Sequence, residues 1–253
     1  MNQPKTTLIC GVIDPRDPGG GCKDSTDWTF SFCLIRWRDS ADVLHTSSLR
    51  IERHVSEAQL LCYNCRLQAL QVRAMRVRFL NETTAELVAL FNAEVTNDAE
   101  LIGYAQEELR PRYFNDAFFG TLILDRRSNC YEGNVPWGSA SVRLSLDADE
   151  NGNLSAIPQS ARDLWAQQPT WSERVLQYAT EHLLDTKNDF WLEEEEECLT
   201  PQQFKSRLHL TAVTIGSSGA FVFCYDDDGL FYGHSISVFG NLTEGPITAT
   251  LMG

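Results

Sequence analysis

Residues 226–229 read Asp-Asp-Asp-Gly, and His234 follows five residues after Gly229. Carboxylates and an imidazole at this spacing could bind a metal ion together or act as an acid–base pair. An Asp-Gly pair between two apolar runs is also typical of a turn between strands. On the predicted strand after this turn, Tyr232 and His234 would share one face. We therefore expect His234 to be a hydrogen-bonded sheet histidine, with a binding contact and a catalytic group as the alternatives.

A second acidic segment comes directly after Trp191 and Leu192 and consists of five consecutive glutamates. Such a run is most simply a solvated segment, and its functional interpretation is a docking site for basic side chains. Trp191 adds an aromatic residue of the type that often carries interface energy. The predicted partner-binding residues are Trp191, Glu193, Glu194, Glu195, Glu196, Glu197, Asp226, Asp227, Asp228, Tyr232 and His234.

Charge is distributed unevenly along the 253 residues, whose net charge is −14. Residues 1–80 hold 11 Lys/Arg and 8 Asp/Glu, whereas residues 81–253 hold 10 and 27. A field of one sign attracts cationic partners and repels nucleic acid and anionic lipid. This pattern predicts a basic protein partner and no nucleic-acid or membrane binding.

The sequence contains eight cysteines, of which only Cys62 and Cys65 have CxxC spacing. A structural zinc site needs a second pair or a set of Cys/His partners at comparable spacing. The N-terminus has no basic stretch followed by a long apolar run, so we expect a cytoplasmic protein with free thiols, without disulfides and without metal.

Other motifs are incomplete. Asp147, Asp149, Asn151 and Gly152 match the start of a calcium loop, but its twelfth position is Pro158 instead of a bidentate Glu. No GxSxG elbow and no glycine-rich phosphate loop occurs. The sequence therefore predicts no cofactor and no catalytic residue, although an active site assembled from distant residues stays open.

Three arginines, Arg73, Arg76 and Arg78, follow a strand-like segment over residues 71–80. We interpret them as a basic outer face that is paired within the fold, because no aromatic platform for RNA accompanies them.

Alternating residues predict strands over residues 28–37, 48–53, 71–80, 118–125, 142–146, 211–215, 220–225, 230–239 and 247–251. Helices are predicted after the capping boxes at Ser56, Thr170 and Thr200, and over residues 84–91, 98–109 and 160–167. Because strands and helices do not alternate regularly along the chain, we expect an α+β fold with mixed, mainly antiparallel sheets and packed helices. We expect a small β-rich domain with one helix over residues 1–80, a helical connector over 81–115, and an acidic α+β domain over 116–253.

From about Asp116 to Gly253 the chain resembles a bacterial family of unknown function, the one numbered 2262. The resemblance rests on Phe119-Gly120-Thr121-Leu122, Asn188 with Trp191, Phe204 with Arg207 and Leu208, and most specifically residues 225–236, Tyr-Asp-Asp-Asp-Gly-Leu-Phe-Tyr-Gly-His-Ser-Ile. It implies a cytosolic bacterial protein, and some relatives resemble immunity proteins encoded beside toxins. The family offers no established catalytic residues.

These observations favour an acidic binding protein of the immunity or antitoxin type that neutralises a basic toxin by direct contact. The alternatives are a metal-dependent hydrolase that uses Asp226, Asp228 and His234, and a scaffolding module without catalytic activity. The oligomeric state is left open.

Overall fold

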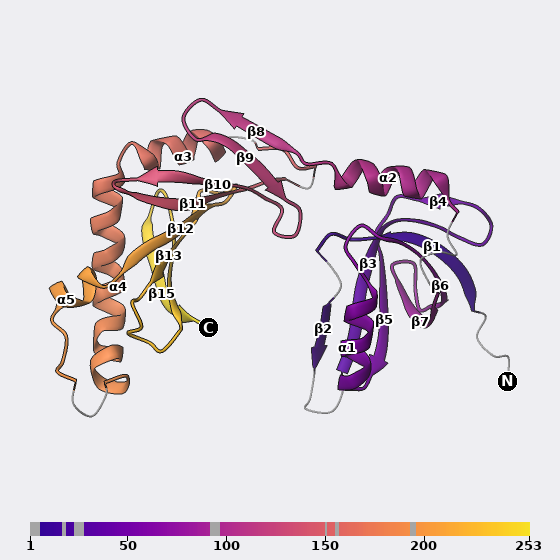
Figure 1. Cartoon of the computed structure of the whole chain (residues 1–253), viewed down its shortest axis with the longest axis horizontal. Helices are drawn as coiled ribbons and strands as arrows, with labels where there is room; N and C mark the ends of the chain where they lie inside the picture. Colours follow the sequence, from indigo (N-terminus) through magenta and orange to yellow (C-terminus); the bar gives the residue numbers. More distant parts are fainter. Residues whose placement is uncertain are drawn as a thin grey trace. The chain divides into compact units, whose positions relative to one another are not determined.

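A computed structural model describes residues 6–16, 19–22, 28–91, 97–149, 151–154, 157–192 and 196–253, with backbone only for residues 19–22. The chain forms two compact units, Met1–Pro111 and Arg112–Gly253. Among the described residues, no helix has the length and apolar character needed to span a bilayer. Each unit has its own sheet and hydrophobic core (Figure 1).

The first unit is a closed barrel of five strands. These are β1 (Thr7–Ile13), β3 (Trp28–Arg38), β5 (Leu49–Val55), β6 (Val72–Phe79) and β7 (Thr84–Leu90). Their order is β1-β6-β7-β5-β3, and β3 pairs back with β1. Only the β5–β7 pair of this ring is parallel. Two short strands, β2 (Gly19–Cys22) and β4 (Leu44–His45), pair with β3.

Helix α1 (Glu57–Arg66) lies between the third and fourth barrel strands of the chain, β5 and β6. Its capping box is formed as expected, with the Ser56 hydroxyl accepting from the Gln59 N–H. This connectivity is that of an OB-fold barrel, a scaffold that serves many functions. The outward residues paired between β3 and β5 (Thr29 with His54, Ser31 with Glu52, Cys33 with Arg50) include no Phe, Tyr or Trp. This face therefore lacks the aromatic platform on which nucleic-acid bases stack.

The barrel interior is filled by alternate strand residues, which include Phe30, Phe32, Leu34, Ile51, Met75 and Val77. Gly11 of β1 packs closely against side chains of β3, because a Cβ there would lie 2.7 Å from Leu34 Cδ1 and 2.9 Å from Trp37 Cβ. Helix α2 (Ala99–Leu109) packs outside the barrel, with Leu101 and Ala105 against Val12 and Leu70.

The second unit is one eight-stranded sheet in the order β15-β14-β13-β12-β11-β10-β9-β8. The strands are β8 (Tyr113–Asp116), β9 (Gly120–Asp125), β10 (Cys130–Trp137), β11 (Ala140–Asp147), β12 (His209–Ile215), β13 (Ala220–Asp226), β14 (Ser235–Asn241) and β15 (Gly245–Met252). Neighbours are antiparallel except β11 and β12. A parallel pair needs a long crossover, and here it contains α3 (Ile157–Trp165), α4 (Gln168–Phe190) and α5 (Pro201–Ser206).

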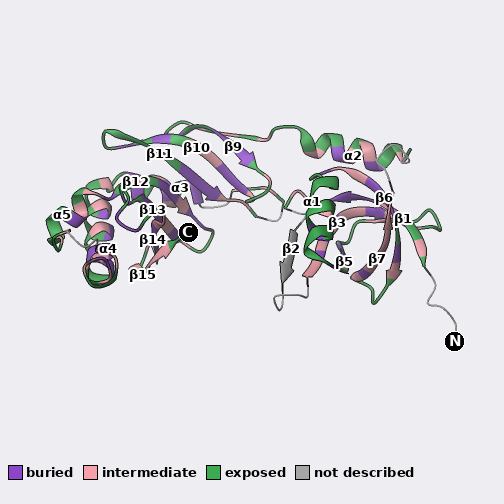
Figure 2. Cartoon of the chain, turned by 60° about the horizontal axis from the view of Figure 1, so that its bottom comes forward, coloured by how far each residue is buried: buried purple, intermediate pink, exposed green. Residues whose placement is uncertain are grey.

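The long helix α4 runs alongside the sheet and contacts β14, β15 and α5 (Figure 1). Its buried residues Trp171, Val175, Ala179 and Leu183 join a core with alternate residues of the central strands, which appear as purple bands in Figure 2. Trp171 and Phe221 meet edge to face, with ring centres 5.3 Å apart. This packing fixes the direction of α4 and therefore the position of its C-terminal end.

The expected mixed, mainly antiparallel sheets with packed helices are present, although the protein is predominantly β. The helix predicted over residues 84–91 is wrong. That segment is β7, which closes the barrel between β6 and β5 because Ala85 and Leu87 alternate into its core. The predicted cap at Thr170 is also wrong, since α4 already begins at Gln168 and Thr170 lies inside it.

The side chains of Arg73, Tyr232 and His234 do not lie on the faces predicted for them. Arg73 is only 5% exposed and lies opposite Gly11, so it faces the barrel interior and not the outer face of Arg76 and Arg78. The strand predicted over residues 230–239 begins only at Ser235, so Tyr232 and His234 belong to the preceding loop and do not share a strand face.

Candidate binding site

The C-terminal end of α4 and the loop of residues 227–234 meet through aromatic side chains. The ring centre of Trp191 lies 5.6 Å from that of Phe231, 5.6 Å from that of Tyr232 and 5.4 Å from that of His234. We call these four residues the aromatic cluster. Three of them (Trp191, Tyr232 and His234) were predicted as binding residues from separate parts of the sequence.

Asp227 gives the loop its shape. Its carboxylate accepts hydrogen bonds from the N–H of Gly229 at 3.0 Å and the N–H of Phe231 at 2.7 Å. Asp227 is 2% exposed, and Phe231 is fully buried against Trp191 and Phe204 of α5. Asp227 therefore stabilises the turn and offers little surface to a partner.

Tyr232 has an unusual backbone. Its φ is +49°, followed by +92° at Gly233, and its side chain is on the surface at 56% exposure. The left-handed region is costly for a residue with a Cβ and is seldom occupied by a tyrosine. Strain of this kind concentrates at functional sites. Tyr232 is also the exposed residue of the aromatic cluster, so it is the candidate contact residue.

His234 is half-buried. Its Nδ1 lies 2.8 Å from the Phe231 carbonyl oxygen, which can only accept, so Nδ1 carries the proton and donates. This hydrogen bond and the contact with Trp191 fix the ring. His234 is thus hydrogen-bonded as expected, but in a loop and not in a sheet.

Lys187 anchors the acidic segment that follows α4. Although it is a lysine, its side chain is 2% exposed, and its ammonium donates to the Trp191 carbonyl at 2.6 Å and to Glu196 Oε2 at 2.5 Å. Asn188 ties down the next part, because its side chain exchanges two hydrogen bonds with the backbone of Leu199. Glu197 is exposed, whereas Glu193, Glu194 and Glu195 lie outside the described residues.

Asp226 at the end of β13 and Asp228 in the loop are exposed and take part in local hydrogen bonds. Asp226 accepts from the N–H of Asp228 at 2.8 Å. Arg207 donates to the Asp228 carboxylate at 3.2 Å and to its carbonyl oxygen at 2.6 Å. The described part of the chain contains no group of three His, Cys, Asp or Glu side chains placed to hold a metal ion.

Three residues of this region were missed from the sequence. Phe190, at the end of α4, is 81% exposed, the highest value among the described large hydrophobic residues that lie on the surface. Its position directly before Trp191 was an available signal. Phe231 and Lys187 are buried, and the burial of Lys187 had no signal, since lysines are almost never fully buried unless paired.

Most of the second unit matches a known protein family. The family model for an uncharacterized protein conserved in bacteria, DUF2262, matches residues 116–251. The chain belongs to this family. A search of curated proteins gives no match. The matched region contains the whole aromatic cluster, whereas the barrel lies before it.

Proposed function

We propose that this protein is a cytoplasmic binding protein of the immunity type, which neutralises a basic protein by direct contact. The proposed contact surface consists of Trp191, Tyr232 and His234 with the exposed acids Asp226, Asp228 and Glu197. The observation that carries the proposal is the exposed Tyr232, held at positive φ against Trp191.

Electrostatics support a cationic partner. The second unit, residues 112–253, carries nine Lys/Arg and twenty Asp/Glu, a net charge of −11. Such a field speeds association with a cationic surface and disfavours acidic partners. Toxins that cleave nucleic acids need cationic surfaces for their own substrates, so an anionic protein can occupy that surface.

The side chains of the cluster support a contact surface of the usual kind. Interfaces place rigid aromatic residues at their centre and charged residues around them. Trp191 and Tyr232 are held by backbone and ring contacts, so little side-chain freedom would be lost on binding. The chemistry of hydrolysis receives less support, because Asp228 contacts Arg207 while His234 contacts Trp191 and the Phe231 carbonyl.

Affinity capture from the native bacterial host tests the proposal, followed by co-expression of the captured protein with and without this chain. We expect a basic protein that inhibits growth alone and loses its toxicity in the presence of this chain. Capture of only acidic proteins, or a basic partner whose toxicity is unaffected, would contradict the proposal.

Charge reversal provides the matched comparison. Glu197→Lys with Asp226→Lys should slow association with the captured partner severalfold, because both side chains are exposed and belong to the proposed contact surface. Glu181→Lys with Asp185→Lys reverses two exposed acids on α4, changes the net charge by the same amount and is the control. Equal effects of the two changes would show that only net charge matters and that the surface is wrongly placed.

A further inference from the structure

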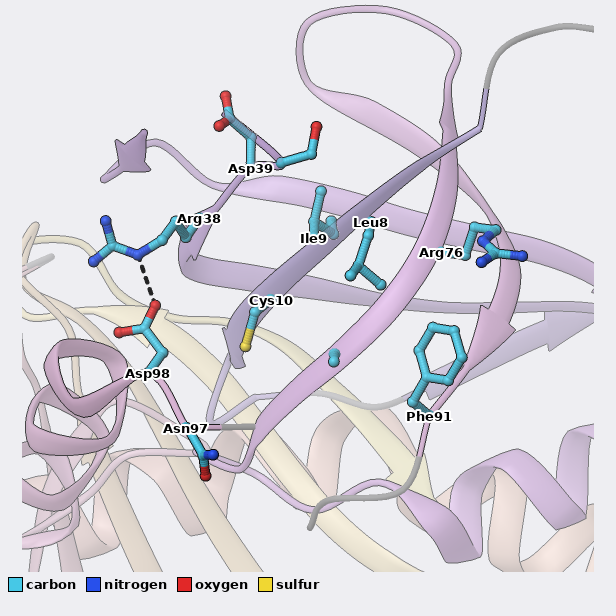
Figure 3. Close-up of a pocket in the computed structure, with 11 residues that line it drawn as sticks. Leu8, Ile9, Cys10, Arg38, Asp39, Arg76, Phe91, Asn97 and Asp98 are labelled. Carbon is cyan, nitrogen blue, oxygen red and sulfur yellow. Dashed lines mark hydrogen bonds and ion pairs between the residues drawn. The ribbon is translucent and has the colours of Figure 1, made fainter. Parts of the chain in front are cut away.

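The barrel unit has a pocket of about 350 Å³ on its outer surface, independent of the aromatic cluster (Figure 3). Its apolar lining is formed by Leu8 and Cys10 of β1, Ala74 of β6, and Phe91 after β7. Leu8 is 51% exposed, although the other large hydrophobic residues of β1 are buried. A pocket of this size falls within the range that holds small molecules.

The acids beside the pocket are already occupied. Asp98 accepts from the Arg38 side chain at 2.7 Å and from the first N–H groups of α2, so it serves as the cap of that helix. Asp39 accepts from two backbone N–H groups and from His45. These bonds leave the two carboxylates little capacity for a cationic ligand.

Arg38 is neutralised in the same network, since it donates to Asp98 and, at 2.7 Å, to Glu100. Arg76 differs. It is exposed at the opposite side of the pocket, its guanidinium lies 6.0 Å from the centre of the Phe91 ring, and no carboxylate among the described residues pairs with it. The neighbouring Arg78, by contrast, donates to Glu86 at 2.8 Å.

We propose that this pocket binds a small apolar carboxylate, with the carboxylate at Arg76 and the apolar body against Leu8, Cys10, Ala74 and Phe91. The guanidinium offers a planar set of donors that matches a carboxylate. The apolar lining excludes water and favours an alkyl or aromatic body. Arg76 would repel the positive charge of an amine of the same shape, and the two carboxylates of the lining are already paired.

Octanoate and octylamine are suitable probes, because they share an eight-carbon chain and differ in the sign of their charge. Their affinities for the full chain are to be measured by calorimetric titration at pH 7. We expect octanoate to bind at least tenfold more tightly than octylamine. Arg76→Gln should weaken octanoate binding at least fivefold, whereas Arg78→Gln should leave it within twofold.

Ala74→Trp should fill the pocket and abolish octanoate binding. If that variant does not fold, Leu8→Asn at the exposed rim should weaken binding severalfold. The proposal is overturned if octanoate does not bind, if octylamine binds equally well, or if Arg78→Gln weakens binding as much as Arg76→Gln does. These results are independent of any effect on the aromatic cluster.

Discussion

The ring centres of Trp191 and Tyr232 lie 5.6 Å apart, although one residue ends α4 and the other belongs to the loop before β14. This contact joins the acidic segment after α4 to the turn formed by Asp227. Glu196, which shares the Lys187 ammonium with the Trp191 carbonyl, and the loop that follows Asp226 therefore lie at one aromatic cluster.

Replacement of Tyr232 should reveal the strain at its backbone. Tyr232→Ala and Tyr232→Gly both remove the ring, but only alanine keeps a Cβ at the φ of +49°. We expect the glycine variant to be the more stable of the two by about 1 kcal/mol. Urea unfolding of both variants measures the difference. A more stable alanine variant would show that the backbone there is not strained.

Removal of the Lys187 ammonium should destabilise the second unit. Lys187→Ala leaves Glu196 and the Trp191 carbonyl without their buried donor, and we expect a loss of about 3 kcal/mol in the free energy of unfolding. Lys205→Ala is the control, because Lys205 pairs at 2.8 Å with Glu173, whose side chain is 71% exposed. That variant should lose less than about 1 kcal/mol. Similar losses in the two variants would contradict the anchoring role of Lys187.

The sequence predicted the regular elements where local patterns decide them. The capping boxes at Ser56 and Thr200 and the alternation from Trp28 to Trp37 all give the expected elements. The segment Thr84–Leu90 failed because its apolar residues also suit a helix, and only pairing with β5 and β6 makes it a strand. Parallel pairs such as β5 with β7 depend on contacts far apart in sequence, which no local pattern specifies.

For the candidate site, residue types could be read from the sequence, whereas the burial and the partners of each side chain could not. Trp191, Tyr232 and His234 were predicted, and they meet in one cluster. The burial of Asp227 depends on backbone N–H groups that turn toward it only after the loop forms. Arg73 lies two residues before Met75, so strand alternation already places it on the inward face, and grouping it with Arg76 and Arg78 was wrong.

Thiol labelling should separate the cysteines by their surroundings. Burial, followed by the hydrogen bond to Asp147, raises the pKa of the Cys130 thiol to about 12. Cys62, Cys65 and Cys198 are exposed and free. With N-ethylmaleimide at pH 7.5, mass spectrometry should find these three modified first and Cys130 only after unfolding. Early modification of Cys130 in the folded protein would contradict its buried position.

Acid should weaken the fold in part through Asp116. Burial by itself would raise the pKa of this carboxyl, but hydrogen bonds from the N–H groups of Phe118 and Phe119 and the contact with Arg162 hold it below its usual value. The folded state therefore binds this proton more weakly than the unfolded chain does. The ionised carboxylate stabilises the fold above the unfolded pKa of about 4, and this contribution is lost as the pH falls through the folded pKa.

Asp116→Asn should accordingly reduce the fall in the urea midpoint between about pH 5 and pH 2. Asp163→Asn, at a neighbouring exposed acid on α3, is the control and should leave the fall as in the unchanged protein. An unaltered pH dependence in Asp116→Asn would show that this carboxylate does not contribute.

Two tyrosines of the second unit allow the most direct test of the binding surface. Tyr232 is 56% exposed in the aromatic cluster, and Tyr113 is 57% exposed on β8, so the two offer equal surface in different places. The measurement is the Kd of the captured basic partner for the unchanged chain, Tyr232→Ala and Tyr113→Ala. We expect Tyr232→Ala to weaken binding at least tenfold, which corresponds to about 1.4 kcal/mol, and Tyr113→Ala to stay within twofold. Equal Kd values for the two variants, or a larger loss in Tyr113→Ala, would contradict the assignment of this surface.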